Sequence, residues 1–188
     1  MLEFNFSPFP IIETERLIMR KVTLDDKDAF FELRTNPIVN RYIDRDPMKS
    51  VEEAEELILK IIGSLDNNDA ISWTINLKGN DRMIGSIDFW RIDKNHHRAE
   101  IGYTLHPDYH HQGIMSEAMD AALEHGFKHM KLHSVEANVN PANAASKKIL
   151  EKHGFVLEAY FRENYHYNGK FLDSLIYSLL NKYDIHSE

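Results

Sequence analysis

Residues 99–116 read Ala-Glu-Ile-Gly-Tyr-Thr-Leu-His-Pro-Asp-Tyr-His-His-Gln-Gly-Ile-Met-Ser. The pattern predicts a strand over 99–105, a short turn, and a helix that runs from about Met115 to Met130. The first turn of a helix has N–H groups without partners and carries the positive end of the helix dipole, so this junction is a candidate anion site. Gly113 would let the backbone approach a phosphate closely, because no side chain intervenes. Taken alone, one glycine here fits a tight turn without a ligand equally well.

The segments before this stretch predict an irregular arm, two helices and three more strands. A cap-like signature at Thr23 starts a helix towards Thr35, and Ser50 to Glu53 form a capping box. Apolar residues then recur at helical spacing as far as Leu65. The other elements are the arm at 1–12 and strands over 16–20, 71–77 and 84–90.

The segments after it alternate strand, helix and hairpin. A strand over 134–139 precedes a helix from Asn143 to His153, and Gly154 lies where a left-handed helix cap is expected. Asn168-Gly169 is a strong hairpin signal between two final strands. The whole order predicts an α+β fold, with a mixed sheet covered by helices on both faces.

Composition narrows the class of protein. A length of 188 residues suits a single domain over residues 1–188, and the absence of cysteine excludes disulfides and thiolate zinc sites. A net charge of -8 argues against nucleic-acid binding, and is compatible either with a cationic substrate or with simple solubility. No apolar run approaches a membrane span and the first residues lack a signal-peptide pattern, so a cytoplasmic location is expected.

The anion-site stretch resembles the pyrophosphate loop of the GNAT N-acetyltransferase superfamily, whose pattern is Gln/Arg-x-x-Gly-x-Gly/Ala. Gly113 matches the pattern, whereas His110 and Met115 depart from it at the first and last positions. Other segments are similar, in order, to the ribosomal-protein (RimJ/RimL-like) branch of that superfamily. They are Glu13 to Arg20, Ala99 to Tyr103, Asn138 to Ser146, His153-Gly154-Phe155, and Arg162 to Ser178.

This resemblance implies a mostly antiparallel sheet that splays between its fourth and fifth strands, at 99–105 and 134–139. Acetyl-CoA would be the co-substrate, with its pantetheine arm in the splay and its pyrophosphate on the backbone from His111 to Ser116. Gly102 inside the fourth strand is consistent with a bulge. The residues implied in coenzyme binding are Leu105, His106, Pro107, His110, His111, Gln112, Gly113, Ile114, Met115, Ser116, Asn138, Asn143 and Ser146.

Acetyl transfer to an amine needs a neutral nucleophile and a proton for the leaving thiolate. Glu100 and Glu136 are candidate bases on neighbouring strands, although each also fits a structural carboxylate. Ser146 is the candidate acid, because the position that a tyrosine often holds in the family falls near Ile149 here. A serine that only bonds the helix backbone or the coenzyme is the alternative.

The acceptor is expected to be a primary amine, most simply a protein N-terminal α-amine as in the ribosomal-protein enzymes. A polyamine or aminoglycoside and a non-catalytic acyl-CoA-binding module are the alternatives. Residues suited to a cation are Tyr42, Asp44, Asp46, Phe161, Tyr165 and Tyr167. The histidines at 106, 110, 111, 125 and 129 lack the carboxylate spacing of a metal site, so no metal is expected. The apolar arm at 1–12 is a candidate contact in a homodimer.

Overall fold

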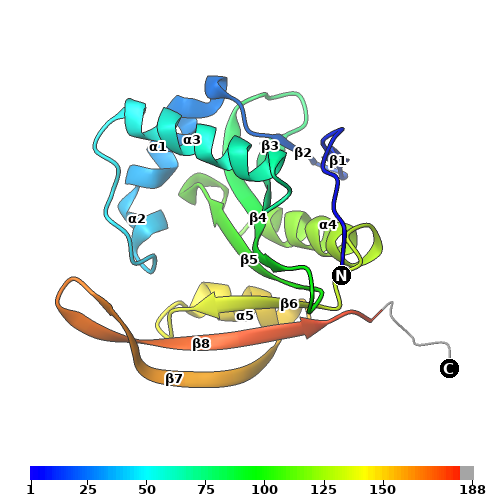
Figure 1. Ribbon diagram of the computed structural model, residues 1–188. Coiled ribbons are helices and arrows are strands. Elements are labelled where there is room, and N and C mark those ends of the chain that lie inside the picture. The colour runs from blue at the N-terminus through cyan, green and yellow to red at the C-terminus, as the bar shows by residue number, and fades with distance from the viewer. Residues whose placement is uncertain (183–188) are drawn as a thin grey trace, which may run out of the picture.

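An eight-stranded sheet runs through the computed structural model, which describes residues 1–182 (Figure 1). The strand order is β1-β2-β3-β4-β5-β6-β8-β7. The strands are β1 Ile12–Glu13, β2 Leu17–Lys21, β3 Ile71–Leu77, β4 Met83–Asp93, β5 Arg98–Leu105, β6 Ser134–Val139, β7 Val156–Tyr167 and β8 Lys170–Leu180. The helices are η1 Leu24–Asp26, α1 Lys27–Thr35, α2 Pro37–Asn40, α3 Val51–Asp66, η2 Pro107–Tyr109, α4 Ile114–Lys128 and α5 Ala144–Lys152.

The sheet is mostly antiparallel, which confirms the predicted fold class. Its one parallel ladder joins β5 to β6, the fourth and fifth strands of the sequence prediction, over three residue pairs that end at Glu100 and Glu136. Beyond that pair β5 continues beside β4 as far as Leu105, and β6 continues beside β8 as far as Val139. The register shows where the pairing of β5 with β6 stops. It does not give the separation of the two strands beyond that point, so the splay stays a prediction.

Helices cover both faces of the sheet (Figure 1). Helix α4 packs on the face to which Phe89 points, where the Phe89 ring lies against Gly126. Helices α1 and α3 bury Phe30, Leu33 and Ile58 in a second cluster on the opposite face, together with Met83 of β4. The two sides of the sheet are therefore separate environments, one against α4 and α5 and the other against α1 and α3.

Local sequence signals set several boundaries as predicted. Asn143 caps α5, with its Oδ1 accepting the Ser146 amide at 3.0 Å. Gly154 adopts a left-handed φ of 85° directly after that helix. Asn168 and Gly169 have φ values of 47° and 74°, the left-handed pair that a tight hairpin turn needs, and they join β7 to β8.

Other local predictions are wrong in detail. Ser50 accepts the Glu53 amide, but the Glu53 carboxylate accepts the amide of Lys49 and so does not complete the capping box. The register of β5 is unbroken at Gly102, which pairs directly with Asp88. The irregularity lies in β4 instead, between Trp90 and Asp93.

The N-terminal arm packs on the core of its own chain. Phe6 is buried, the Phe9 ring meets Trp73 edge-on, and the Trp73 indole N–H donates to the Pro10 carbonyl at 2.8 Å. Ile12 belongs to β1 and no longer to the arm. No helix within residues 1–182 is both long enough and apolar enough to span a membrane.

We expect Gly126→Ala to lower the free energy of unfolding by about 1–2 kcal/mol, although alanine favours helices over glycine. A Cβ at this position would lie 2.9 Å from the Phe89 ring and 3.3 Å from Leu132. Gly63→Ala in α3 is the matched control, because nothing lies within 4 Å of its added Cβ. Chemical denaturation should show a loss for the first variant and a gain of about 0.5–1 kcal/mol for the second. Equal gains in both would contradict close packing of α4 on the sheet.

Candidate functional site

The backbone at the start of α4 has the geometry of an anion site. The first intrahelical hydrogen bond runs from the Glu117 N–H to the Gly113 carbonyl, at 3.0 Å. The amides of Ile114, Met115 and Ser116 therefore have no acceptor inside the helix. Gly113 has a φ of 77° and precedes these amides without a Cβ. Such a helix end fits a phosphate or pyrophosphate.

The turn that leads into α4 is fixed by its own side chains. The His110 ring contacts the Leu105 carbonyl at 3.0 Å, and Gln112 donates to the Asp108 carbonyl at 2.7 Å. His106 accepts the Asp108 amide at 3.3 Å and reaches Glu32 of α1 at 3.1 Å. The His110 ring thus fixes this turn to β5 and the His106 ring fixes it to α1, roles that spacing alone did not indicate.

Burial explains how the turn accommodates a methionine at the last motif position. Ile114 and Met115 are 3% and 9% exposed, so both side chains enter the core and leave only their amides at the helix end. The bulky Met115 therefore does not fill the space where an anion would bind. The remaining predicted residues of this turn are Pro107, the first residue of η2, and His111, two residues before Gly113.

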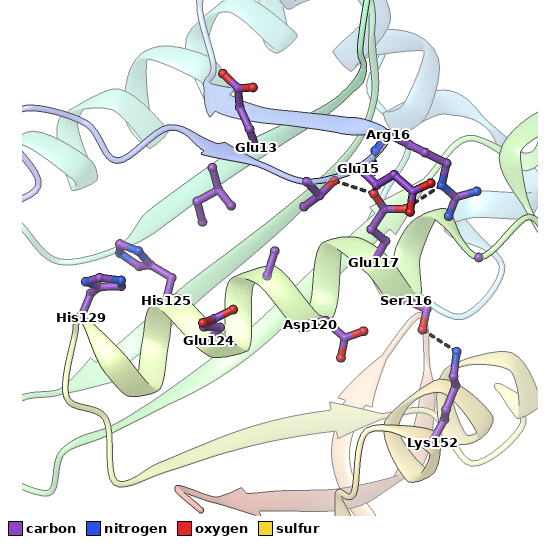
Figure 2. A pocket seen from close by; sticks show the side chains of 14 residues that line it. Glu13, Glu15, Arg16, Ser116, Glu117, Asp120, Glu124, His125, His129 and Lys152 are labelled. Carbon is purple, nitrogen blue, oxygen red and sulfur yellow. Dashed lines mark hydrogen bonds and ion pairs between the residues drawn. The ribbon is translucent and has the colours of Figure 1, made fainter. Parts of the chain in front are cut away.

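Two cations that the sequence analysis missed lie beside this helix end (Figure 2). Lys152 of α5 donates to the Ser116 hydroxyl at 2.7 Å. Arg16 donates to the Gln112 carbonyl at 2.9 Å, and its Nη2 lies 3.4 Å from where a Gly113 Cβ would be. The two side chains border an open pocket of about 690 Å³ that runs along α4. Their positive charge and the free amides together fit the phosphates of a nucleotide coenzyme.

Acidic side chains also line this pocket. Its lining includes Glu13, Glu15, Asp120 and Glu124, and Glu117 pairs with Arg16 at 2.6 Å (Figure 2). Carboxylates therefore lie both beside Arg16 and further along α4 (Figure 2). The part of the pocket near Lys152 and the free amides is the part that suits a phosphate.

A pair of hydroxyl groups joins β5 to α5. The Tyr103 and Ser146 oxygens are 2.6 Å apart, and the Ser146 amide is fixed by the Asn143 cap. Burial raises the pKa of Tyr103 to about 12, against the opposing effect of its bond to Ser146. The phenol therefore stays protonated at neutral pH and can supply a proton. The sequence analysis named Ser146 but missed Tyr103, which is 43 residues away along the chain.

The two predicted bases lie side by side where the β5–β6 ladder ends. Glu100 is 8% exposed and accepts a bond from Arg91 at 3.0 Å, while Glu136 is ion-paired with Arg98. Burial raises the pKa of Glu100; Arg91 opposes this rise, and the charge of Glu136 adds to it. Both carboxylates are therefore already paired with arginine. Asn138 is exposed on β6, two residues beyond this pair.

Two arginines line the face of the sheet opposite α4. Burial lowers the pKa of Arg34 on α1, and the charge of Asp88 on β4 opposes this lowering. Burial also lowers the pKa of Arg45 to about 10, with a further lowering from Arg34. Arg45 donates to the Asn40 side chain at 3.1 and 2.9 Å. This face therefore carries two partly desolvated positive charges.

The loop after α2 is tied to the final hairpin. Tyr165 donates to Asp44, and Tyr167 donates to Asp46 at 3.0 Å. Four of the six residues considered suited to a cation are thus engaged with one another.

No group of three or more His, Cys, Asp or Glu side chains within residues 1–182 is placed to hold a metal ion. His125 and His129 stack with ring centroids 5.1 Å apart, and burial lowers the pKa of His125 to about 4.

Comparisons with a family model and with individual proteins indicate the same family. Residues 16–156 match the model of the acetyltransferase (GNAT) domain. The chain is 34% identical to the uncharacterized N-acetyltransferase YoaA of Bacillus subtilis, over 92% of this chain and 97% of that protein. It is 26% identical to the spermidine N(1)-acetyltransferase of Vibrio cholerae, over 92% of this chain and 98% of that protein.

Solved structures share the fold. A GNAT-family acetyltransferase from Bacillus anthracis superposes with a TM-score of 0.81 at 30% identity, covering 92% of this chain and 99% of that one. RimL, a ribosomal L7/L12 alpha-N-protein acetyltransferase solved with coenzyme A, gives 0.81 at 23% identity, covering 91% and 98%. The helix-end anion site, the fold and the family match agree, and the chain belongs to the GNAT acetyltransferase family as an N-acetyltransferase.

Proposed function

We propose that this N-acetyltransferase transfers the acetyl group of acetyl-CoA to the N-terminal α-amine of a protein. The amides of residues 114–116, with Arg16 and Lys152 beside them, would hold the coenzyme phosphates. Because α4 lies on one face of the sheet, the coenzyme would approach from that face. The acceptor amine would approach from the face that carries Glu100 and Arg34.

The Tyr103–Ser146 pair would protonate the leaving thiolate. A thiolate expelled at the end of the β5–β6 ladder needs one proton, and the pair offers two linked hydroxyl groups. Ser146, in the first turn of α5, would donate its proton to the thiolate, and Tyr103 would then reprotonate Ser146. This assignment keeps the predicted role of Ser146 and adds a tyrosine from β5.

The observation that carries the choice of acceptor is the pair of partly buried arginines on the acceptor face. Arg34 and Arg45 would repel the second and third ammonium groups of a polyamine. The same guanidinium groups can donate hydrogen bonds to the backbone carbonyls of a peptide. An N-terminal amine is also about a quarter neutral near pH 7.3, so it demands less of the enzyme than lysine does.

A polyamine is the second candidate acceptor. Its support is the relative from Vibrio cholerae named spermidine N(1)-acetyltransferase, which aligns over 92% of this chain. The acidic loop residues Asp44 and Asp46 would attract a polycation, although both already accept bonds from tyrosines. Competition between the two acceptors in one assay decides between them.

We expect thiol release from acetyl-CoA to be faster with peptides that have a free N-terminus than with spermidine, an aminoglycoside or Nα-acetylated lysine peptides. Arg45→Gln should raise kcat/KM for spermidine about tenfold, because it removes a charge that repels the polyamine. Arg41→Gln, at an exposed position beside Tyr42, is the control and should leave the preference unchanged. Faster release with spermidine on the unmodified enzyme would overturn the proposed acceptor.

We expect Ser146→Ala and Tyr103→Phe each to lower kcat by about 10- to 100-fold while the Kd of acetyl-CoA changes little. The physical reason is loss of a proton donor without loss of the phosphate site. Tyr177→Phe is the matched control, since it removes a buried phenol that bonds Glu151 at 3.0 Å on the same side of the sheet.

Stopped-flow kinetics gives kcat, and calorimetry gives the coenzyme Kd. Unchanged turnover in both variants would remove the hydroxyl pair from the mechanism. Coenzyme binding without transfer to any amine, in the unmodified protein, would instead favour the non-catalytic acyl-CoA-binding alternative.

A further inference from the structure

Asp88 is a third carboxylate on the proposed acceptor face, besides the predicted bases Glu100 and Glu136, and no role has yet been assigned to it. It lies on β4 directly opposite Gly102 of β5, and the neighbouring pair of that ladder joins Trp90 to Glu100. Paired residues project to the same face of a sheet, so Asp88 and Glu100 share the face opposite α4.

The missing Cβ of Gly102 makes room for this carboxylate. A Cβ there would lie 2.8 Å from Asp88 Oδ1 and 3.4 Å from Oδ2, so the carboxylate rests directly on the β5 backbone. Gly102 is two residues past Glu100, where the β5–β6 ladder stops. At about 3.3 Å per residue, this places Asp88 roughly 7 Å into the stretch of β5 that has no partner in β6.

Asp88 is also unengaged, in contrast to its neighbours. Glu100 and Glu136 are ion-paired with Arg91 and Arg98. Within residues 1–182, no hydrogen bond or close ion pair joins the Asp88 side chain to another group, and its exposure is intermediate. A carboxylate that is unpaired, partly exposed and set against the sheet can accept a proton from a bound ligand.

We propose that Asp88 is the general base, contacting the acceptor ammonium and removing its proton. The neutral nitrogen then attacks the thioester carbon, a C–N bond forms, and the C–S bond breaks to release the coenzyme thiolate. The thiolate takes its proton from the Ser146–Tyr103 pair on the other face. The new amide nitrogen loses its remaining extra proton to water, water reprotonates the hydroxyl pair, and Asp88 returns its proton to solvent.

The charges around Asp88 agree with this role. Burial raises the pKa of Asp88 to about 7; Arg34 on α1 opposes the rise, and Glu100 on β5 adds to it. A base with a pKa near the working pH combines an ionised fraction with useful basicity. Near neutral pH the Asp88 side chain would therefore be partly ionised and able to accept a proton.

The test is the pH dependence of kcat/KM for Asp88→Asn. The unmodified enzyme should gain activity up to about pH 7 as Asp88 ionises. The variant should be slowed about 100-fold at that pH and should follow the ionisation of the amine itself, near pH 8 for an α-amine. Its deficit should therefore shrink above about pH 9, where the amine needs no base.

Two comparison variants separate chemistry from folding. Asp69→Asn changes an exposed carboxylate and should leave the profile unchanged. Glu100→Gln should keep the inflection near pH 7, shifted slightly downward because a negative neighbour of Asp88 is lost. A wild-type profile in Asp88→Asn, loss of the inflection in Glu100→Gln alone, or an equal deficit at every pH would each overturn the proposal.

Thermal stability gives a readout that does not depend on the acceptor. Because the folded-state pKa of Asp88 is raised, its carboxyl costs stability as pH rises from about 4 to 7. Asp88→Asn should thus melt several degrees higher than the unmodified protein at pH 7.5, and nearly the same at pH 4.

The inference rests on the proposed function only in requiring an amine acceptor. The profile is measured with whichever amine the acceptor panel identifies, so a wrong acceptor class and a wrong base give different results. Unchanged acetyl-CoA affinity in calorimetry confirms that the coenzyme site is intact in Asp88→Asn.

Discussion

The short parallel ladder between β5 and β6 is the constraint on which the rest of the site depends. Each strand has one edge satisfied, by β4 and by β8, but the facing edges pair over only three residues. Past Glu100 and Glu136, backbone N–H and C=O groups of both strands lack partners in the sheet. Unpaired backbone groups are costly when buried, so this interval suits a ligand that carries amide groups of its own. The proposed coenzyme site uses that interval and the adjoining helix end.

The sheet then divides the chemistry between its two faces. The alternation of side chains along β5 sends Tyr103 towards α5 and Glu100 towards the opposite side. The helix end proposed to bind phosphate and the hydroxyl pair therefore share one face. The carboxylates and the arginines share the other. A reaction that must deprotonate one reactant and protonate another is served by such a separation, because the two groups cannot neutralise each other.

The sequence predicted those features that depend on a few adjacent residues. Asn143 as a helix cap, Gly154 as a left-handed residue and the Asn168-Gly169 turn each follow from local backbone preferences, and each is found. Contacts between segments that are distant in the sequence were not predicted. Nothing in the spacing connects Tyr103 with Ser146, or Lys152 with Ser116, because sheet register and helix packing bring them together. Gly102 shows the limit well: a strand glycine indicated a bulge, whereas its actual neighbour is a carboxylate from β4.

The same surroundings that bury these groups also separate their proton affinities. Burial raises the pKa of Tyr103 to about 12 and that of Asp88 to about 7, so near neutral pH the phenol is protonated while the carboxyl is partly ionised. Pairs of groups whose environments differ in this way are the usual means by which one site holds both an acid and a base. Glu100 and Glu136 differ from Asp88 in that each is occupied by an arginine partner, Arg91 and Arg98. A carboxyl whose pKa is raised on folding lowers the stability of the folded state at neutral pH, and Asp88, on the face of the sheet opposite α4, is such a group.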